Sequence, residues 1–246
     1  MDTNKIETLQ RMVDESERIV FFGGAGVSTE SGIPDFRSVD GLYNQKYDYP
    51  PEQILSHTFF MRNRPEFYRF YYDKIIVDGV EPNAAHKKLA EMEAAGKLTA
   101  VITQNIDGLH QKAGSKHVLE LHGTVLNNIC LSCGREYGLD FIEEQKVKKI
   151  MEPQCPACGG IVKPDVVLYE EGLDQDVITE SIRQLSQADM LIIGGTSLVV
   201  YPAAGLIDYY NGDKLVLINK SQTSRDSRAN LVISDSIGEV LSQIRV

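Results

Sequence analysis

The chain has 246 residues, of which 42% are hydrophobic and 24% are charged, and its formal net charge at pH 7 is −10. Its length suits one large domain, or one large and one small domain, and its composition is that of a globular protein. The acidic balance disfavours general binding to nucleic acid, because phosphate contacts need clustered Lys and Arg, and it fits a basic protein partner.

Short apolar strands alternate with helical segments along the chain, which is typical of an α/β fold with a doubly wound parallel sheet. The spacing of apolar residues predicts helices near the N-terminus, over 83–96, over 174–187, near 203–209 and from 236 onward. Apolar runs predict buried strands over 18–22, 98–103, 190–193, 214–219 and 231–234, with an extended segment over 161–169.

No segment has the hydrophobicity of a membrane anchor or a secretion signal. No apolar run approaches the ~20 residues that a membrane span needs, and Met1 to Ser16 lacks the apolar centre of a signal peptide. We therefore expect a cytoplasmic protein that binds neither membranes nor nucleic acid directly.

Glycines follow the first predicted strand in the turn Gly23-Gly24-Ala25-Gly26, after which we expect a helix. Glycines let the backbone approach a phosphate, and a helix N-terminus offers free N–H groups. Open α/β sheets bind dinucleotides at such a turn, although Thr29 stands where the usual spacing has its third glycine. The turn predicts a dinucleotide site, and a tight turn without a ligand remains the alternative.

Pro34 ends any helix beyond this turn and places Asp35, Phe36 and Arg37 in a loop. A loop with an acid, an aromatic ring and a guanidinium beside a cofactor could recognise the far end of that cofactor. The alternative is a surface ion pair between Asp35 and Arg37, which would contribute little to stability.

Polar residues follow the second buried strand in Gln104-Asn105-Ile106-Asp107. Such residues at the carboxyl end of a parallel strand border the ligand crevice, where Asn and Asp can bind an amide. The alternative is that Asn105 and Asp107 only cap the next helix. Among five histidines His122 stands out, because Gly123 and the cysteine-rich stretch follow it. Imidazole is the natural general base near pH 7.

The four cysteines form two Cys-x-x-Cys pairs, Cys130 with Cys133 and Cys155 with Cys158. Four thiolates can surround Zn²⁺ as a tetrahedron and leave no open position, so the pattern predicts one structural zinc ion. A redox pair would need only one Cys-x-x-Cys. A nucleic-acid-binding ribbon is disfavoured, because five basic and five acidic residues balance over 128–163.

Taken together, these motifs resemble the sirtuin family. The resemblance is carried, in family order, by 24–28, 31–37, 103–110, His122-Gly123, the paired cysteines, 195–204 and Asn219. It implies a Rossmann-like NAD-binding domain (1–38, 97–127 and 161–246), a helical insertion (39–96) and a zinc-binding module (128–160).

The resemblance also implies an activity, in which acetyl or other uncharged acyl groups are removed from protein lysines. NAD would be the co-substrate, the acyl group would move to ADP-ribose, and nicotinamide would be released. His122 would be the base for the cofactor ribose, with Asn105 and Asp107 as its catalytic partners. The implied cofactor contacts are Gly24, Ala25, Thr29, Phe36, Arg37, Gln104, Asn105, Ile106, Asp107, Thr196, Ser197, Asn219 and Ser236.

An acylated peptide would add as a strand along 166–169 and contact Val167, Leu168 and Tyr169, with Val200 facing it. From the pattern alone, an ordinary core strand is the alternative for this segment. Leu168 and Glu170 depart from the family, which has Phe and Gly there, and Gly23 replaces a common Thr.

The branch of the family that removes acidic acyl groups pairs a Tyr with an Arg three residues on. Here Tyr68 is followed at that spacing by Tyr71. We therefore expect acetyl or other uncharged groups to be preferred over succinyl.

Two other functions fit parts of the sequence. An NAD-dependent oxidoreductase with a structural zinc would usually carry an acid ~20 residues past the glycine turn, and no acid in a clear strand-end context stands there. A non-enzymatic zinc-ribbon adaptor leaves the glycine turn, the segment 104–107 and His122 unexplained.

Overall fold

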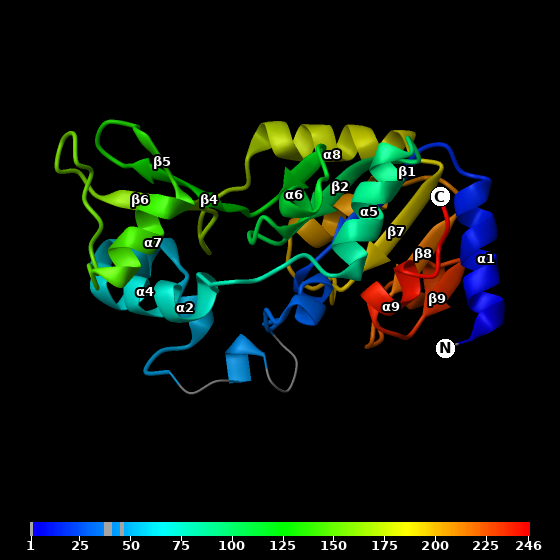
Figure 1. Ribbon diagram of the computed structural model, residues 1–246, viewed down its shortest axis with the longest axis horizontal. Helices are drawn as coiled ribbons and strands as arrows, with labels where there is room; N and C mark the ends of the chain where they lie inside the picture. Colours follow the sequence, from blue (N-terminus) through cyan, green and yellow to red (C-terminus); the bar gives the residue numbers. More distant parts are fainter. Residues whose placement is uncertain (1, 37–40, 45–46) are drawn as a thin grey trace.

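The computed structural model describes residues 2–36, 41–44 and 47–246 (Figure 1). Within these residues a parallel sheet has six strands in the order β3-β2-β1-β7-β8-β9. Their bounds are β1 Ile19–Gly23, β2 Leu98–Thr103, β3 Val118–Glu120, β7 Met190–Gly194, β8 Leu215–Ile218 and β9 Leu231–Ile233. The chain order runs outward in both directions from the neighbours β1 and β7, which confirms the doubly wound parallel sheet.

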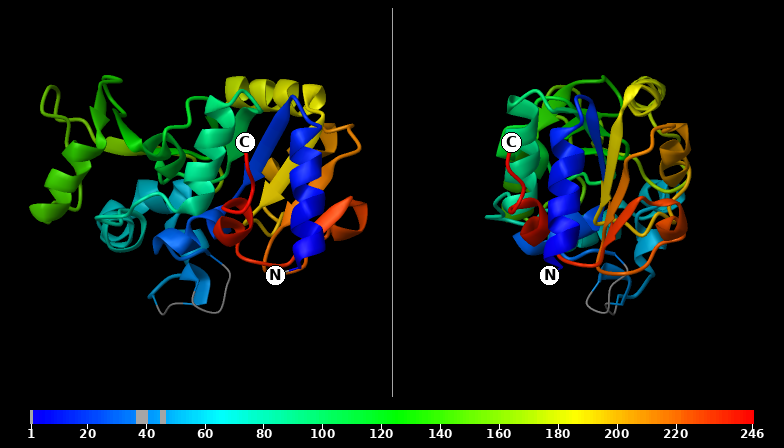
Figure 2. Two further views of the ribbon diagram at one scale, coloured as in Figure 1. Left: turned by 45° about the vertical axis from the view of Figure 1, so that its right-hand side comes forward. Right: turned by 90° about the vertical axis from the view of Figure 1, so that its right-hand side faces the viewer.

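The apolar runs form central strands because both faces of the sheet are covered. Successive side chains of a strand point to opposite faces, so Phe21 and Ile192 join one buried cluster whereas Phe22 and Ile193 join the other. The first face is covered by α1 (Thr3–Asp14), α5 (Ala84–Ala94) and α9 (Ile237–Leu241), and the second by α8 (Gln175–Gln187) and η5 (Ala203–Tyr209). Figure 2 shows these two helical layers on either side of the strands.

A smaller unit lies at the other end of the molecule (Figure 1). In the described chain it contains a three-stranded antiparallel sheet with the order β5-β4-β6, formed by β5 (Glu136–Gly138), β4 (Gly123–Cys130) and β6 (Val162–Val166). Around it lie α7 (Leu139–Val147), α2 (Pro51–Ile54), α3 (His57–Arg62) and α4 (Arg64–Phe70), which continues as a π turn over Tyr71–Ile75. One aromatic-rich cluster joins these helices to the sheet, through residues such as Phe67, Val125 and Ile142.

The segment 39–96 therefore contributes to two cores. Its first helices pack in the aromatic cluster, whereas Ala85, Leu89 and Met92 of α5 pack in the core of the large sheet. Short 3₁₀ turns also occur at η3 (Leu42–Asn44) and η6 (Asp226–Arg228), and α6 (Leu109–Ala113) packs beside α5. The domain boundaries at 39, 97, 128 and 161 remain a prediction.

The prediction of a helix directly after the glycine turn is wrong. Two 3₁₀ turns occur instead, η1 (Ala25–Val27) and η2 (Thr29–Ser31), and they end at Gly32 with φ +89°. The Val27 carbonyl, which a continued helix would use within its own backbone, instead accepts from the side chain of Asn83, whose Nδ2 lies 2.7 Å away. The N–H groups of Gly24 and Gly26 donate to the carbonyls of Gly194 and Gly195, and no long helix dipole lies behind the turn.

None of the helices in the described part of the chain is both long and apolar enough to span a membrane.

The turn after β1 makes a close contact with β7 that requires glycine at 195. Gly195 has φ +59°, and an added Cβ would lie 2.3 Å from the Val27 nitrogen. Gly79 has φ +70° but open space around the same position. We expect Gly79→Ala to cost about 1–2 kcal/mol of unfolding free energy from backbone strain alone, and Gly195→Ala to cost clearly more because backbone must move. Equal losses in urea unfolding would contradict this packing argument.

Candidate active site and metal centre

The predicted site residues follow the carboxyl ends of the strands of the large sheet. Gly24 follows β1, the segment 104–107 follows β2, His122 follows β3, and Thr196 follows β7. Asn219 comes directly after β8, and Ser236 is the first residue before α9, just beyond β9. Because parallel strands end at the same edge, the fold gathers these residues along one line, with the reversal of chain order between β1 and β7 at its centre.

Three of the predicted segments meet at this reversal. Gly26 N–H donates to the Gly195 carbonyl at 2.8 Å, and an added Cβ on Gly24 would lie 2.9 Å from Thr196 Cβ. Gln104 Nε2 donates to Thr196 Oγ1 at 3.0 Å. The turns after β1, β2 and β7 are therefore in direct contact. Glycine at 24 and at 26 permits this approach, because a side chain at either position would collide with the turn after β7.

The Asn105 and Asp107 side chains converge on a hydroxyl that the motif analysis did not assign to the site. Asn105 Nδ2 donates to Ser28 Oγ at 3.1 Å, and Ser28 Oγ donates to Asp107 Oδ2 at 2.6 Å. Asp107 Oδ1 accepts from Leu109 N–H at 2.9 Å at the start of α6, so the carboxylate also has the capping role. Both oxygens of Asp107 are thereby fixed, and its charge lies beside the glycine turn.

Two buried histidines lie behind this group, and sequence reasoning missed both. His86 and His110 have ring centroids 4.7 Å apart, and His86 Nε2 lies 3.5 Å from Ser28 Oγ. Burial lowers the pKa of His86 to about 4, against an opposing effect of Asp107, and lowers the pKa of His110 to about 3. Both rings are therefore neutral near pH 7. His110 is the last residue of the motif 103–110, but the sequence alone assigns no role to either ring.

The His122 side chain forms a hydrogen bond with the backbone just after β2, at the residue before Asn105. Its Nδ1 lies 3.1 Å from the Gln104 carbonyl oxygen, which can only accept, so Nδ1 carries the proton and Nε2 is left as the acceptor. Burial lowers the pKa of His122, and the bond to the Gln104 carbonyl partly offsets that shift. A neutral imidazole with a fixed tautomer is what a general base requires.

The glycine after His122 has a physical reason. Gly123 has φ +72°, and an added Cβ would lie 2.0 Å from the Asp165 carbonyl oxygen. The chain turns sharply there, and the His122 carbonyl accepts from Val167 N–H at 2.9 Å. The candidate base is therefore tied directly to the segment expected to bind the peptide.

In that segment Leu168 is buried in the aromatic cluster, whereas Tyr169 is 39% exposed. Glu170 has φ +77°, the conformation that glycine would adopt without strain, and its carboxylate accepts from Thr58 N–H at 2.9 Å. Val167 and Val200 are both half-buried, and Val200 lies in the turn between β7 and η5. The departure at Glu170 thus keeps the backbone shape expected of glycine and adds a tie to α3.

The remaining predicted cofactor contacts are more scattered. Thr29 Oγ1 donates to the Gly26 carbonyl at 3.0 Å, and Asn219 Nδ2 donates to the Ser221 carbonyl at 2.8 Å, so both side chains shape their own turns. Ser197 is exposed beyond β7, and Ile106 is half-buried between Asn105 and Asp107. Phe36 is half-buried at the end of the described loop, and Arg37 lies outside the described residues.

The four cysteine sulfurs lie within 4.8 Å of one another. The Sγ atoms of Cys130 and Cys158 are 3.5 Å apart, and those of Cys133 and Cys155 are 3.7 Å apart. A tetrahedron with Zn–S bonds of about 2.3 Å has S–S edges of about 3.8 Å. The donor set and its dimensions therefore fit one zinc ion, at the end of β4 opposite to His122.

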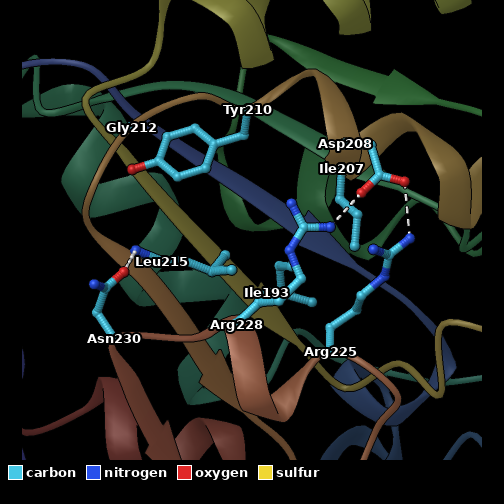
Figure 3. Close-up of a pocket in the computed structure, with 9 residues that line it drawn as sticks. All are labelled: Ile193, Ile207, Asp208, Tyr210, Gly212, Leu215, Arg225, Arg228 and Asn230. Atoms are coloured by element: carbon cyan, nitrogen blue, oxygen red, sulfur yellow. Dashed lines mark hydrogen bonds and ion pairs between the residues drawn. The ribbon is translucent and has the colours of Figure 1, made fainter.

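A hollow on the face of the large sheet shares no residue with the predicted site (Figure 3). It lies between η5 and the start of β8, and Asp208 there accepts from Arg225 Nη2 and Arg228 Nη1, each at 2.8 Å. Asp208 pairs with both guanidinium groups, and the three side chains together keep one net positive charge. We interpret this cluster as a structural ion pair.

Comparison with known proteins agrees with this geometry. The Sir2 family model matches residues 24–202, more than half of the chain. The chain belongs to the Sir2 family. Among relatives, a protein of Clostridium acetobutylicum named NAD-dependent protein deacetylase is 58% identical over 98% of each chain. A protein of the same name from Clostridium perfringens is 59% identical, again over 98% of each chain.

A solved Sir2 structure with a deacetylated p53 peptide and 3′-O-acetyl-ADP-ribose superimposes with a TM-score of 0.88 at 38% identity. The match covers 97% of this chain and 96% of that one. The sirtuin resemblance and the Rossmann-like fold are thus confirmed. The roles of individual site residues remain predictions.

The zinc centre of this Sir2 protein predicts a simple dependence on the metal. Structural zinc sites contribute folding free energy directly, so Cys130→Ala should lose the metal and unfold the small sheet. We expect one zinc per chain in the wild type by atomic absorption, and clear loss of zinc together with a lower thermal midpoint in the variant. The exposed Ser132→Ala, in the same knuckle, should keep both. A zinc-free Cys130→Ala variant with unchanged stability would contradict the structural role.

Proposed function

We propose that this Sir2 protein removes acetyl groups from lysine side chains of proteins and consumes NAD. The products are nicotinamide, O-acetyl-ADP-ribose and free lysine. The observation that carries the proposal is that His122 binds the Gln104 carbonyl, directly before Asn105 and Asp107. A candidate base and a candidate amide-binding pair are thereby held at one point of the dinucleotide crevice.

Asn105, Ile106 and Asp107 are suited to bind the nicotinamide amide. Asn105 carries both a donor and an acceptor, and Ser28 fixes its orientation through Nδ2. The Asp107 carboxylate brings negative charge to the pocket, which favours positive charge that develops at the sugar as the pyridine leaves. NAD supplies the sugar carbon that receives the acyl oxygen and the nicotinamide that departs.

His122 would act on the sugar hydroxyls. With its proton on Nδ1, the ring presents Nε2 as an acceptor, and its lowered pKa keeps it neutral at pH 7. A base that is already neutral can take a hydroxyl proton without first losing one of its own. The remaining cofactor contacts would come from Gly24, Ala25, Gln104 and Thr196 at the centre of the crevice, and from Thr29, Phe36, Arg37, Ser197, Asn219 and Ser236 around it.

The peptide would add as a strand to the segment 166–169. One edge of this segment is already paired, because Val167 N–H donates to the His122 carbonyl and Tyr169 N–H to the Leu55 carbonyl. On the opposite edge the Leu168 N–H donates to Glu171 Oε2 at 2.9 Å and the Leu168 carbonyl accepts from Glu171 N–H at 3.0 Å. The peptide would pair with Leu168 there by displacing Glu171. Backbone pairing gives affinity with little demand on the sequence of the target.

The partners are acylated proteins or peptides. We also propose that the chain works in the cytoplasm without direct contact to nucleic acid or membranes. The four-cysteine site, the net charge of −10 and the balance of five basic and five acidic residues over 128–163 support this proposal.

The activity and the role of His122 can be tested together. Nicotinamide release from NAD should require an acetyl-lysine peptide, and His122→Ala should lower kcat by about 10²–10⁴-fold, the usual contribution of a general base. His117→Ala is a matched control, because His117 lies at the start of β3 and binds the Thr99 carbonyl. Nicotinamide release at the same rate with and without the acetyl-lysine peptide would refute the proposed activity. Near-normal turnover by His122→Ala would remove only the base.

The fall of kcat/KM at acid pH should report the protonation of His122. Burial lowers the pKa of His122, so its base form persists below the ordinary His pKa of about 6.5. We expect the midpoint of the acid limb of kcat/KM to lie below pH 6.5, in samples shown to retain zinc. A midpoint above pH 6.5 would contradict a buried base.

An acyl-peptide panel tests the preference for uncharged groups. Tyr68 and Tyr71 are fully buried in the aromatic cluster, and the Tyr68 hydroxyl donates to the Val162 carbonyl. A tyrosine hydroxyl carries no positive charge at any pH, and burial raises the pKa of both hydroxyls, so neither can pair with a carboxylated acyl chain as an Arg would. We expect kcat/KM for a succinyl peptide to be at least about tenfold below that for the acetyl peptide, because an unpaired carboxylate is costly to bury. Better turnover of the succinyl peptide would overturn the expectation.

A further inference from the structure

Two tyrosines join the cofactor side of the site to its peptide side. Tyr43 lies in η3, seven residues beyond Phe36, and Tyr169 lies on the segment expected to bind the peptide. Their hydroxyl oxygens are 2.6 Å apart, so one donates to the other. The bond spans 126 residues of sequence and connects two segments with different expected ligands.

The Tyr43 end is fixed to the cofactor loop. Leu42 N–H donates to the Asp35 carbonyl and Tyr43 N–H to the Phe36 carbonyl, both at 2.9 Å. The rings of Phe36 and Tyr43 pack at 5.5 Å between centroids. Displacement of Phe36, one of the expected NAD contacts, would therefore displace Tyr43 as well.

The Tyr169 end is fixed to the small unit. Tyr169 N–H donates to the Leu55 carbonyl, and His57 N–H donates to the Tyr169 carbonyl, both at 2.9 Å. Leu168 points into the aromatic cluster, and side chains alternate along extended chain. The Tyr169 ring therefore projects away from that cluster, toward the cofactor loop.

We propose that the hydrogen bond between Tyr43 and Tyr169 couples NAD binding to acyl-peptide binding. This inference rests on the proposed function and adds positioning residues to it. A peptide that orders the segment around Tyr169 also orders Tyr43 and, through the packed rings, Phe36. NAD bound against Phe36 orders Tyr169 by the same route. Coupling of this kind is reciprocal, so each ligand raises the affinity for the other by the same factor.

The test measures that factor directly. Isothermal titration gives the affinity of a non-hydrolysable carbocyclic NAD analogue with and without a saturating acetyl-lysine peptide. The variants are Tyr43→Phe, Tyr169→Phe and the double variant, and each removes only a hydroxyl. Tyr209→Phe is the matched control, because Tyr209 is a partly exposed tyrosine of η5 outside the proposed site.

We expect the wild type to bind the analogue more tightly when peptide is present. Each single variant should reduce this enhancement by about three- to tenfold, the range of one neutral hydrogen bond. The double variant should match the single variants, since either change breaks the same bond, and Tyr209→Phe should match the wild type. Coupling that is unchanged in all variants, or losses that add in the double variant, would overturn the proposal.

The outcome separates the two levels of the argument. If the wild type releases no nicotinamide with an acetyl peptide, the proposed function itself fails. If the wild type turns over normally but the phenylalanine variants change only the affinity for peptide alone, the tyrosine bond shapes the peptide segment without coupling, and the inference is refuted.

Discussion

The arrangement of the site depends on the hydrogen bonds of one residue, Gln104. Its backbone N–H donates to the Gly23 carbonyl at 3.0 Å, its side chain donates to Thr196 Oγ1 at 3.0 Å, and its carbonyl accepts from His122 Nδ1 at 3.1 Å. Strands β1, β2 and β7 and the candidate base therefore meet at a single position. The next three residues are those expected to bind nicotinamide, so the base and the leaving-group pocket are separated by one peptide unit rather than by a flexible connection.

The site lies where two differently built units join. The large sheet supplies rigid strand ends, whose neighbours approach so closely that Gly26 and Gly195 are in backbone contact. The small unit supplies the peptide segment, and its geometry depends on the aromatic cluster and on the cysteine site. Hydrogen bonds that cross the junction in the described part of the chain include those from Val167 to His122, from Val125 to Ile106 and between Tyr43 and Tyr169.

Much of the fold could be predicted because its signals are local. Runs such as Ile19–Phe22 and Met190–Ile193 are apolar on both faces, which only a central strand can bury, and the spacing of the cysteines is itself a metal pattern. The helix after Gly26 was predicted wrongly, because Asn83 takes the Val27 carbonyl from 56 residues away. Ser28, His86, His110 and the Tyr43–Tyr169 bond were missed for the same reason. Their contacts join segments that are distant in sequence, so no local spacing of residues predicts them.

The central claim is that the Gln104 carbonyl fixes His122 as a neutral base with its proton on Nδ1. Two-bond ¹H–¹⁵N correlation spectra of the folded protein with ¹⁵N-labelled histidine report both charge and tautomer, once His122 is assigned with a His122→Gln variant. The account predicts a neutral ring at pH 7 with Nδ1 protonated and Nε2 free. A protonated ring at that pH, or a proton on Nε2 alone, would contradict it.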